Sequence, residues 1–147
     1  FKSLGIGKRN WYYDNRGYNM GGIGLILTIK DMIKIGELVL NNGIYNGKRI
    51  ISEKWIQEST ANHSDANGYS YYANKYGYCW WTDEILGQPF VMAMGYGGQY
   101  ILIFKELNLV IATLSNYLDD PSTSFNNSDY IFNTVILKFV SKYIQNT

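Results

Sequence analysis

The fold is decided by the run Gln99–Phe104 (QYILIF), the link Lys105–Asn108 (KELN) and the run Leu109–Leu114 (LVIATL). In the first run, apolar side chains occupy both odd and even positions, which is typical of a strand covered on both faces of its sheet. The link is short, polar in part, and has the length of a hairpin loop. The stretch therefore predicts two neighbouring antiparallel strands in the interior of the protein.

Two further strand-like runs come before this pair, Tyr76–Thr82 and Phe90–Met94. The segments between the runs are short, so each run is expected to pair with the next in an antiparallel meander. The sequence thus predicts a sheet of about three to four strands.

Helix signals flank the strands on both sides. A helix is predicted after Thr28, which can cap it, with Asp31 in its first turn and Asn41-Asn42-Gly43 at its end. A shorter helix is predicted after Ser52, and Asn46-Gly47 between the two helices predicts a tight turn.

A last helix is predicted at the C-terminal end, beginning near Asn127 or Ser128. Its apolar pairs recur every four residues from 131 to 144, and the turn-rich link 119–127 precedes it. Residues 1–22 and 61–75 have no regular period and are expected to be loops. Helices that flank one continuous antiparallel sheet define an α+β fold.

Composition excludes several classes of protein. The chain has 147 residues, a net charge of +1, one Cys and one His. A charge so near zero provides no field to attract nucleic acid. The apolar runs are far shorter than the ~20 residues that cross a bilayer, so no transmembrane segment is expected. One Cys cannot form an internal disulfide.

The usual catalytic groups are scarce. His63 lies in a polar segment and is expected to be a surface residue rather than a catalytic base, and Cys79 is expected to be a small packed hydrophobic residue in a strand. One His and one Cys cannot supply the ligands of a zinc centre. The sequence contains no phosphate-binding loop and no Ser-x-x-Lys motif.

A glycine cluster between two strand runs remains as a candidate site. Residues 93–99 read AMGYGGQ, with glycine at three of the four positions 95–98. A hairpin turn is the favoured interpretation, because glycine suits tight turns. The alternative is a site where exposed backbone N–H groups stabilise a developing oxyanion. The abundant Tyr and Trp could also stack on a sugar, although packing in the core and its rim explains them better.

Several pieces occur in an order that resembles the C-terminal part of serine hydrolases of the β-lactamase/penicillin-binding type. This branch holds class C β-lactamases, D-alanyl-D-alanine carboxypeptidases, related esterases and 6-aminohexanoate-dimer hydrolases. The pieces are Gly21–Leu25, Leu27–Met32 with Gly36, Asn42–Trp55, Tyr76–Tyr78 with Trp80 and Trp81, Gly95–Ile101, and Glu106–Val110.

This resemblance implies roles for the glycine cluster. Members of the family carry a Lys-Thr-Gly-like third motif, which here corresponds to Gly95-Tyr96-Gly97, with Gly95 where the family often has Lys or His. By the same correspondence the Gly98 N–H belongs to the oxyanion hole, and Gly95, Tyr96, Gly97 and Gln99 contact substrate. No cofactor is implied.

The family's other two motifs are not expected in this chain. Ser-x-x-Lys is absent, and two Tyr-x-Asn strings, Tyr13-Asp14-Asn15 and Tyr72-Ala73-Asn74, lie outside the family's position for that motif and are interpreted as coincidental. The chain, which begins at Phe1, is therefore expected to be the C-terminal portion of a larger hydrolase domain, with the nucleophile in an N-terminal portion outside it.

The resemblance implies acyl transfer on an amide or ester, such as a β-lactam, a D-Ala peptide or a small ester. This chain alone is expected to be inactive, and an uncovered sheet edge could cause it to self-associate. An exported or cell-envelope location is favoured over a cytoplasmic one. The alternative function is a non-catalytic binding module, either a pseudoenzyme or a cell-wall or carbohydrate binder.

Overall fold

A six-stranded antiparallel sheet forms the centre of the computed structural model, which describes residues 1–66, 68–70, 72–115 and 124–146. The strands follow one another in chain order across the sheet. They are β3 (Ser64–Asp65), β4 (Lys75–Tyr76), β5 (Trp81–Ile85), β6 (Gln88–Gly95), β7 (Gln99–Phe104) and β8 (Leu109–Thr113). The predicted meander and the hairpin loop 105–108 are confirmed, and β3 and β4 extend the sheet beyond the expected strands.

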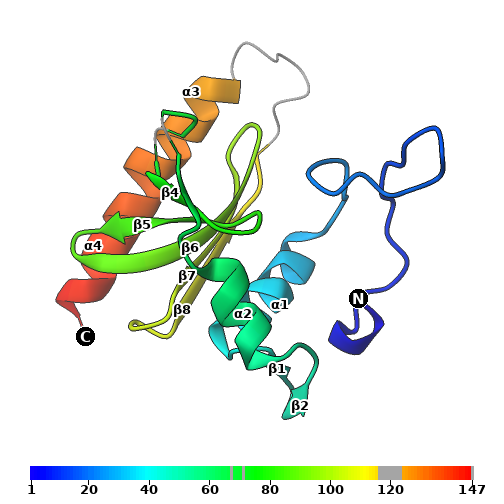
Figure 1. Cartoon of the computed structure of the whole chain (residues 1–147). Helices are drawn as coiled ribbons and strands as arrows, with labels where there is room; N and C mark the ends of the chain where they lie inside the picture. The colour runs from blue at the N-terminus through cyan, green and yellow to red at the C-terminus, as the bar shows by residue number, and fades with distance from the viewer. Residues whose placement is uncertain (67, 71, 116–123, 147) are drawn as a thin grey trace.

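Strand β7 is buried on both of its faces, as its sequence predicts. Even-numbered side chains such as Leu102 and Phe104 pack into a core shared with Phe132 and Val140 of the C-terminal helix. The odd-numbered Ile101 and Ile103 pack into a second core on the opposite face, with Met32, Val39 and Ile56. Figure 1 shows the resulting layers, with α3 and α4 on one side of the sheet and α1 and α2 on the other.

Helices α1 (Ile29–Leu40) and α2 (Glu53–Thr60) begin where the sequence predicts. Thr28 caps α1 in a reciprocal capping box with Asp31, and the Ser52 side chain accepts a hydrogen bond from the Trp55 N–H. Each such cap contributes about 1 kcal/mol to stability. Between the helices, the Asn46-Gly47 turn joins β1 (Ile44–Tyr45) to β2 (Lys48–Arg49) as expected.

The C-terminal helix begins earlier than predicted. Helix α3 (Ser124–Asp129) starts at Ser124, a π-helical segment (Tyr130–Ile136) follows, and α4 (Leu137–Gln145) completes the element. The four-residue recurrence of apolar pairs still marks the buried face, with Phe132, Ile136 and Val140 in the core. Most of the predicted link, residues 119–123, lies outside the described residues.

The prediction of one continuous strand over Tyr76–Thr82 is wrong, because a turn interrupts it. Residues 77–80 form a turn between β4 and β5, in which Cys79 has a positive φ of 64°. Gly77 lies so close to the backbone of Ser59 and Ala61 that a Cβ would be 2.5 Å from either carbonyl oxygen. The chain therefore turns against the end of α2 here rather than continuing straight.

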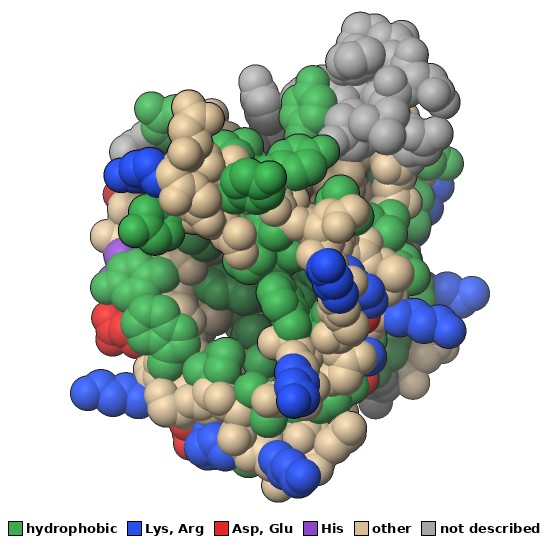
Figure 2. All heavy atoms as spheres, turned by 90° about the vertical axis from the view of Figure 1, so that its right-hand side faces the viewer, with side chains coloured by type: hydrophobic (Ala, Val, Ile, Leu, Met, Phe, Trp, Pro, Cys, Tyr) green, Lys and Arg blue, Asp and Glu red, His purple; other side chains and the backbone are tan. Residues whose placement is uncertain are grey.

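The N-terminal segment is mostly irregular, as expected, and is attached to α1. The Arg9 Nε donates to Asp31 Oδ2 over 2.9 Å, and Lys34 Nζ donates to the Gly5 carbonyl over 3.0 Å. Figure 2 shows this side of the molecule, where hydrophobic side chains surround a hollow and Lys and Arg side chains stand near it. Among the described helices, none is long and apolar enough to cross a membrane.

Candidate functional site

The glycine cluster forms the hairpin turn that joins β6 to β7. Gly95 pairs with Gln99 as the last rung of the ladder, and Tyr96, Gly97 and Gly98 make the turn. Gly97 and Gly98 have φ values of 86° and 88°, which residues with a Cβ rarely adopt. The favoured interpretation of the cluster as a hairpin turn is confirmed, and the backbone conformation of the turn favours glycine at positions 97 and 98.

Contacts from two directions hold this turn in place. The Thr113 hydroxyl at the end of β8 donates to the Gly98 carbonyl over 2.9 Å, and the Ser115 hydroxyl donates to the Gly97 carbonyl. On the other side, Gly98 packs against the C-terminal helix so closely that a Cβ would be 2.6 Å from Ile131 Cδ1. The turn is thus anchored by the neighbouring strand and by the helix.

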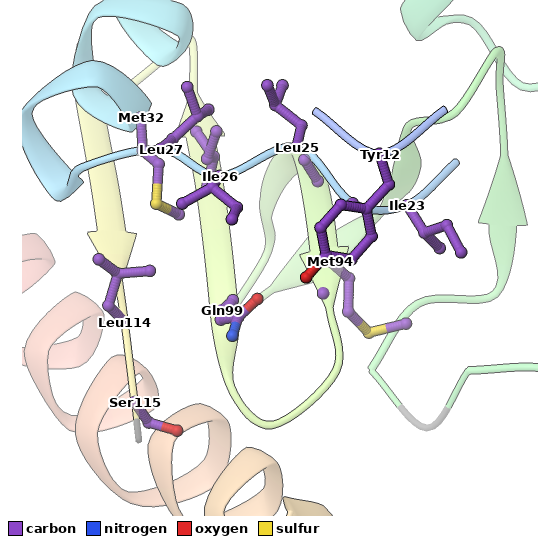
Figure 3. A pocket seen from close by; sticks show the side chains of 14 residues that line it. Tyr12, Ile23, Leu25, Ile26, Leu27, Met32, Met94, Gln99, Leu114 and Ser115 are labelled. Atoms are coloured by element: carbon purple, nitrogen blue, oxygen red, sulfur yellow. The ribbon is translucent and has the colours of Figure 1, made fainter. Parts of the chain in front are cut away.

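A cavity of about 660 Å³ lies beside the hairpin, on the face of the sheet that α1 covers. Its wall comes from the segment 23–27 with Tyr12 and Met32, from the hairpin strands, and from residues 114–115. Figure 3 shows Tyr12, Met94 and Gln99 around this space, with Leu114 and Ser115 at the end of β8. No Asp, Glu, Lys, Arg or His is among the described residues that line it.

The structure brings only part of the predicted site to this cavity. Gly95 and Gln99 line it, whereas Tyr96, Gly97 and Gly98 are not among its lining residues. Tyr96 is 63% exposed. A Cβ at Gly95 would be 3.0 Å from the Gln99 amide oxygen, so the Gln99 side chain occupies the space that a larger residue at position 95 would need.

His63 and Cys79 lie away from the hairpin in the sequence. The predicted environment is correct for His63 and wrong for Cys79. His63 is exposed as expected, with Nε2 2.7 Å from the Glu58 carbonyl and its ring stacked on Tyr78 at 4.2 Å. The expectation that Cys79 is a packed hydrophobic residue is wrong, because the thiol is exposed on the turn between β4 and β5. Within the described residues, no group of three or more His, Cys, Asp and Glu could hold a metal ion.

Sequence reasoning missed the residues that anchor the hairpin and those that face it across the cavity. Thr113 and Ser115 are two polar residues spaced by two at the end of an otherwise apolar strand, a signal that could have been noticed. Tyr12 comes from a loop without a period, and its position depends on the β-bridge between Trp11 and Leu25. Such long-range pairing gives no local signal.

Comparison with solved structures defines the class of the fold. A structure described as a "putative beta-lactamase" from Bacteroides dorei DSM 17855 matches 92% of this chain and 47% of its own, with a TM-score of 0.60 and 22% identity. A "putative 6-aminohexanoate-dimer hydrolase" from Bacillus anthracis matches 84% of this chain and 34% of its own, with a TM-score of 0.54 and 24% identity. The chain has the α+β fold of the C-terminal portion of β-lactamase-like proteins.

Comparison with curated protein sequences finds a related hydrolase. The 6-aminohexanoate-dimer hydrolase of Paenarthrobacter ureafaciens is 26% identical in an alignment over 117 residues that covers 75% of this chain and 29% of that protein. No family model matches the chain. The resemblance inferred from the ordered motifs is confirmed, and the chain spans less than a third of the length of this curated relative.

Proposed function

We propose that this chain is the C-terminal portion of a serine hydrolase that acts by acyl transfer on an amide or ester. The observation that carries the proposal is the tightly anchored glycine hairpin, whose base residues Gly95 and Gln99 line a cavity of about 660 Å³. Cavities of roughly 300–1,000 Å³ are typical of small-molecule sites. The named hydrolase among the relatives supports the reaction class.

In this proposal the hairpin supplies one wall of the site and part of the oxyanion hole. A serine from an N-terminal portion outside this chain attacks the carbonyl, and the Gly98 N–H is one of the donors that hold the oxyanion. Gly95, Tyr96, Gly97 and Gln99 contact the substrate. A backbone donor on an anchored turn suits this role, because it stays in position while charge develops.

The lining of the cavity favours uncharged substrates over those with a carboxylate. Its described residues carry no cation, and Gly95 stands where the family often has Lys or His. A buried carboxylate without a partner costs several kcal/mol. A neutral ester or amide therefore fits the hairpin side of the site best.

Two surfaces support the assignment to part of a larger domain. Strand β8 is at one end of the described sheet and presents an apolar run, Leu109–Ala112, at that edge. Beside the cavity, Tyr12, Ile23 and Ile26 are more than half exposed. A strand whose backbone edge has no partner strand in the described sheet invites pairing with another chain. The isolated chain is expected to associate, so its sedimentation coefficient should rise with concentration. A sedimentation coefficient that stays at the monomer value across the concentration range would contradict this expectation.

The decisive experiment compares the chain of 147 residues with the complete gene product. A fluorophosphonate probe, followed by peptide mapping, should label one serine of the complete product outside residues 1–147, and the isolated chain should show no ester hydrolysis. Labelling of a serine within these residues, or turnover by the isolated chain, would overturn the proposal. In the complete product, neutral p-nitrophenyl esters should be hydrolysed faster than esters with a carboxylate on the acyl group.

A non-catalytic binding module is the second candidate, and one feature favours it. Trp55 and Tyr78 are exposed aromatic residues with ring centroids 5.9 Å apart, and His63 stacks on Tyr78. Exposed rings of this kind can stack on sugars. Titration with cell-wall fragments should quench the Trp55 fluorescence saturably if this function is correct, and Trp55→Ala should abolish the response.

A further inference from the structure

We propose that Thr113 and Ser115 are positioning residues that set the direction of the hairpin amides at the acyl-transfer site. The inference rests on the proposed function, because it concerns the same Gly98 N–H. Neither hydroxyl is assigned a contact with substrate. Each acts through the backbone of the turn.

The starting observation is a pair of hydrogen bonds to consecutive carbonyls. Thr113 Oγ1 donates to the Gly98 carbonyl over 2.9 Å, and Ser115 Oγ donates to the Gly97 carbonyl. Both hydroxyls are partly buried, and Ser115 also lines the cavity beside the hairpin. The end of β8 therefore holds two successive peptide units of the turn.

Because the peptide unit is planar, a hydrogen bond that fixes a carbonyl also fixes the direction of the N–H group in the same unit. In a trans peptide, the C=O and the following N–H point in opposite directions within one plane. A hydrogen bond that fixes the Gly97 carbonyl therefore fixes the direction of the Gly98 N–H. By the same reasoning, the bond to the Gly98 carbonyl fixes the Gln99 N–H, whose residue pairs with Gly95 in the ladder.

The turn needs such anchors because its own residues are permissive. Gly97 and Gly98 both have positive φ, and the peptide unit between two glycines can rotate at low cost. The C-terminal helix restricts one side of Gly98 through its close contact with Ile131. An oxyanion donor is effective only when its direction is set before the reaction. The two hydroxyls supply that preorganisation.

The test uses the complete gene product with single substitutions. Thr113→Val removes the hydroxyl and keeps the branched shape, and Thr113→Ser restores the donor. Misplacement of a reacting group by about 1 Å can cost up to about 100-fold in rate. We expect Thr113→Val and Ser115→Ala to lower kcat for a neutral ester by about 10- to 100-fold with little change in KM, and Thr113→Ser to recover most of the loss.

A matched control separates positioning from general stability. Thr82 is a partly buried threonine, the second residue of β5, and lies away from the turn, so Thr82→Val makes the same chemical change elsewhere in the sheet. Thermal unfolding of all variants should be similar. If Thr113→Val lowers kcat no more than Thr82→Val does, or if Thr113→Ser gives no rescue, the proposal is wrong.

A spectroscopic readout distinguishes this inference from the proposed function. In the complete gene product labelled with ¹⁵N-glycine and ¹⁵N-glutamine, Thr113→Val should shift the amide resonance of Gln99, and Ser115→Ala should shift that of Gly98. Unmoved resonances overturn the anchoring whatever the activity. Shifted resonances in a product without any esterase activity would instead overturn the proposed function and, with it, the catalytic purpose of the anchors.

Discussion

Gly36 of α1 lies so close to Val110 of β8 that a Cβ at position 36 would overlap Val110 Cγ1, with Ile101 Cγ2 only 3.1 Å away. This contact sets how near α1 approaches the sheet. In an ordinary exposed helix, Gly→Ala would gain up to about 1 kcal/mol. Here Gly36→Ala should instead lower the free energy of unfolding by about 1–2 kcal/mol, because overpacking outweighs that gain. Urea denaturation measures the change.

Two comparisons test the cause of this loss. Lys30→Ala changes an exposed position of the same helix and should be nearly neutral. Val110→Ala should make room for the new methyl group, so the loss in the double variant should be smaller than the sum of the two single losses. A strictly additive double variant would show that the overlap at Val110 is not the reason.

Gly98 and Gly87 allow backbone strain to be separated from packing. Both have positive φ, 88° and 75°, but a Cβ at Gly87 would have nothing within 4 Å, whereas one at Gly98 would meet Ile131. Gly87→Ala should therefore cost only the strain, about 1 kcal/mol. Gly98→Ala should cost about 1–3 kcal/mol more. Thermal unfolding of both variants checks this difference.

Removal of the clashing methyl group provides the control for Gly98. Ile131→Val shortens the side chain at the Cδ1 atom in question, so it should relieve part of the loss in Gly98→Ala but none of the loss in Gly87→Ala. Equal losses at the two glycines would contradict the close packing of the turn against the C-terminal helix.

Local patterns predicted the elements whose causes are local. Thr28 with Asp31 and the Asn46-Gly47 turn are signals within a few residues, and the structure has the expected cap and turn. The prediction of one strand over 76–82 was wrong because the aromatic residues of this run suit a strand. The turn at Cys79 depends instead on contact with the end of α2, which is distant in the sequence. The glycines predicted the hairpin. The two polar residues at the end of β8 could have been noticed, but the pattern does not say which carbonyls they bind, because the hydrogen bond from Ser115 to Gly97 joins residues 18 positions apart.

Cys79 is exposed and has a φ of 64°, which is unfavourable for a residue with a Cβ. Its thiol should react with Ellman's reagent in the folded protein without denaturant. Cys79→Gly should raise the free energy of unfolding by about 1 kcal/mol relative to Cys79→Ala, because only glycine removes the steric cost. Both variants lose the thiol and its interaction with Tyr76, so their comparison isolates the backbone effect. A thiol that reacts only after urea is added would contradict the exposed turn.

Asp31 links the N-terminal segment to α1 and should make stability depend on pH. It is 3% exposed, and the hydrogen bond from the Thr28 hydroxyl, with the Arg9 guanidinium beside it, lowers the pKa of its carboxyl from 3.8 to about 2. A lowered pKa means that the ionised group stabilises the folded state. That stabilisation is fully present above pH 4 and is lost as the pH falls towards 2.

The variant Asp31→Asn tests this dependence, since it keeps the shape of the side chain and removes its charge. The urea midpoint of Asp31→Asn should lie below that of the wild type at neutral pH, and the gap should narrow between pH 4 and pH 2, where wild-type Asp31 itself becomes protonated. Asp65→Asn, at an exposed position on β3, serves as the control for loss of one negative charge. A gap that stays constant down to pH 2 would show that Asp31 stabilises the fold through hydrogen bonds that its protonated carboxyl keeps and the Asn amide lacks, and not through its ion pair with Arg9.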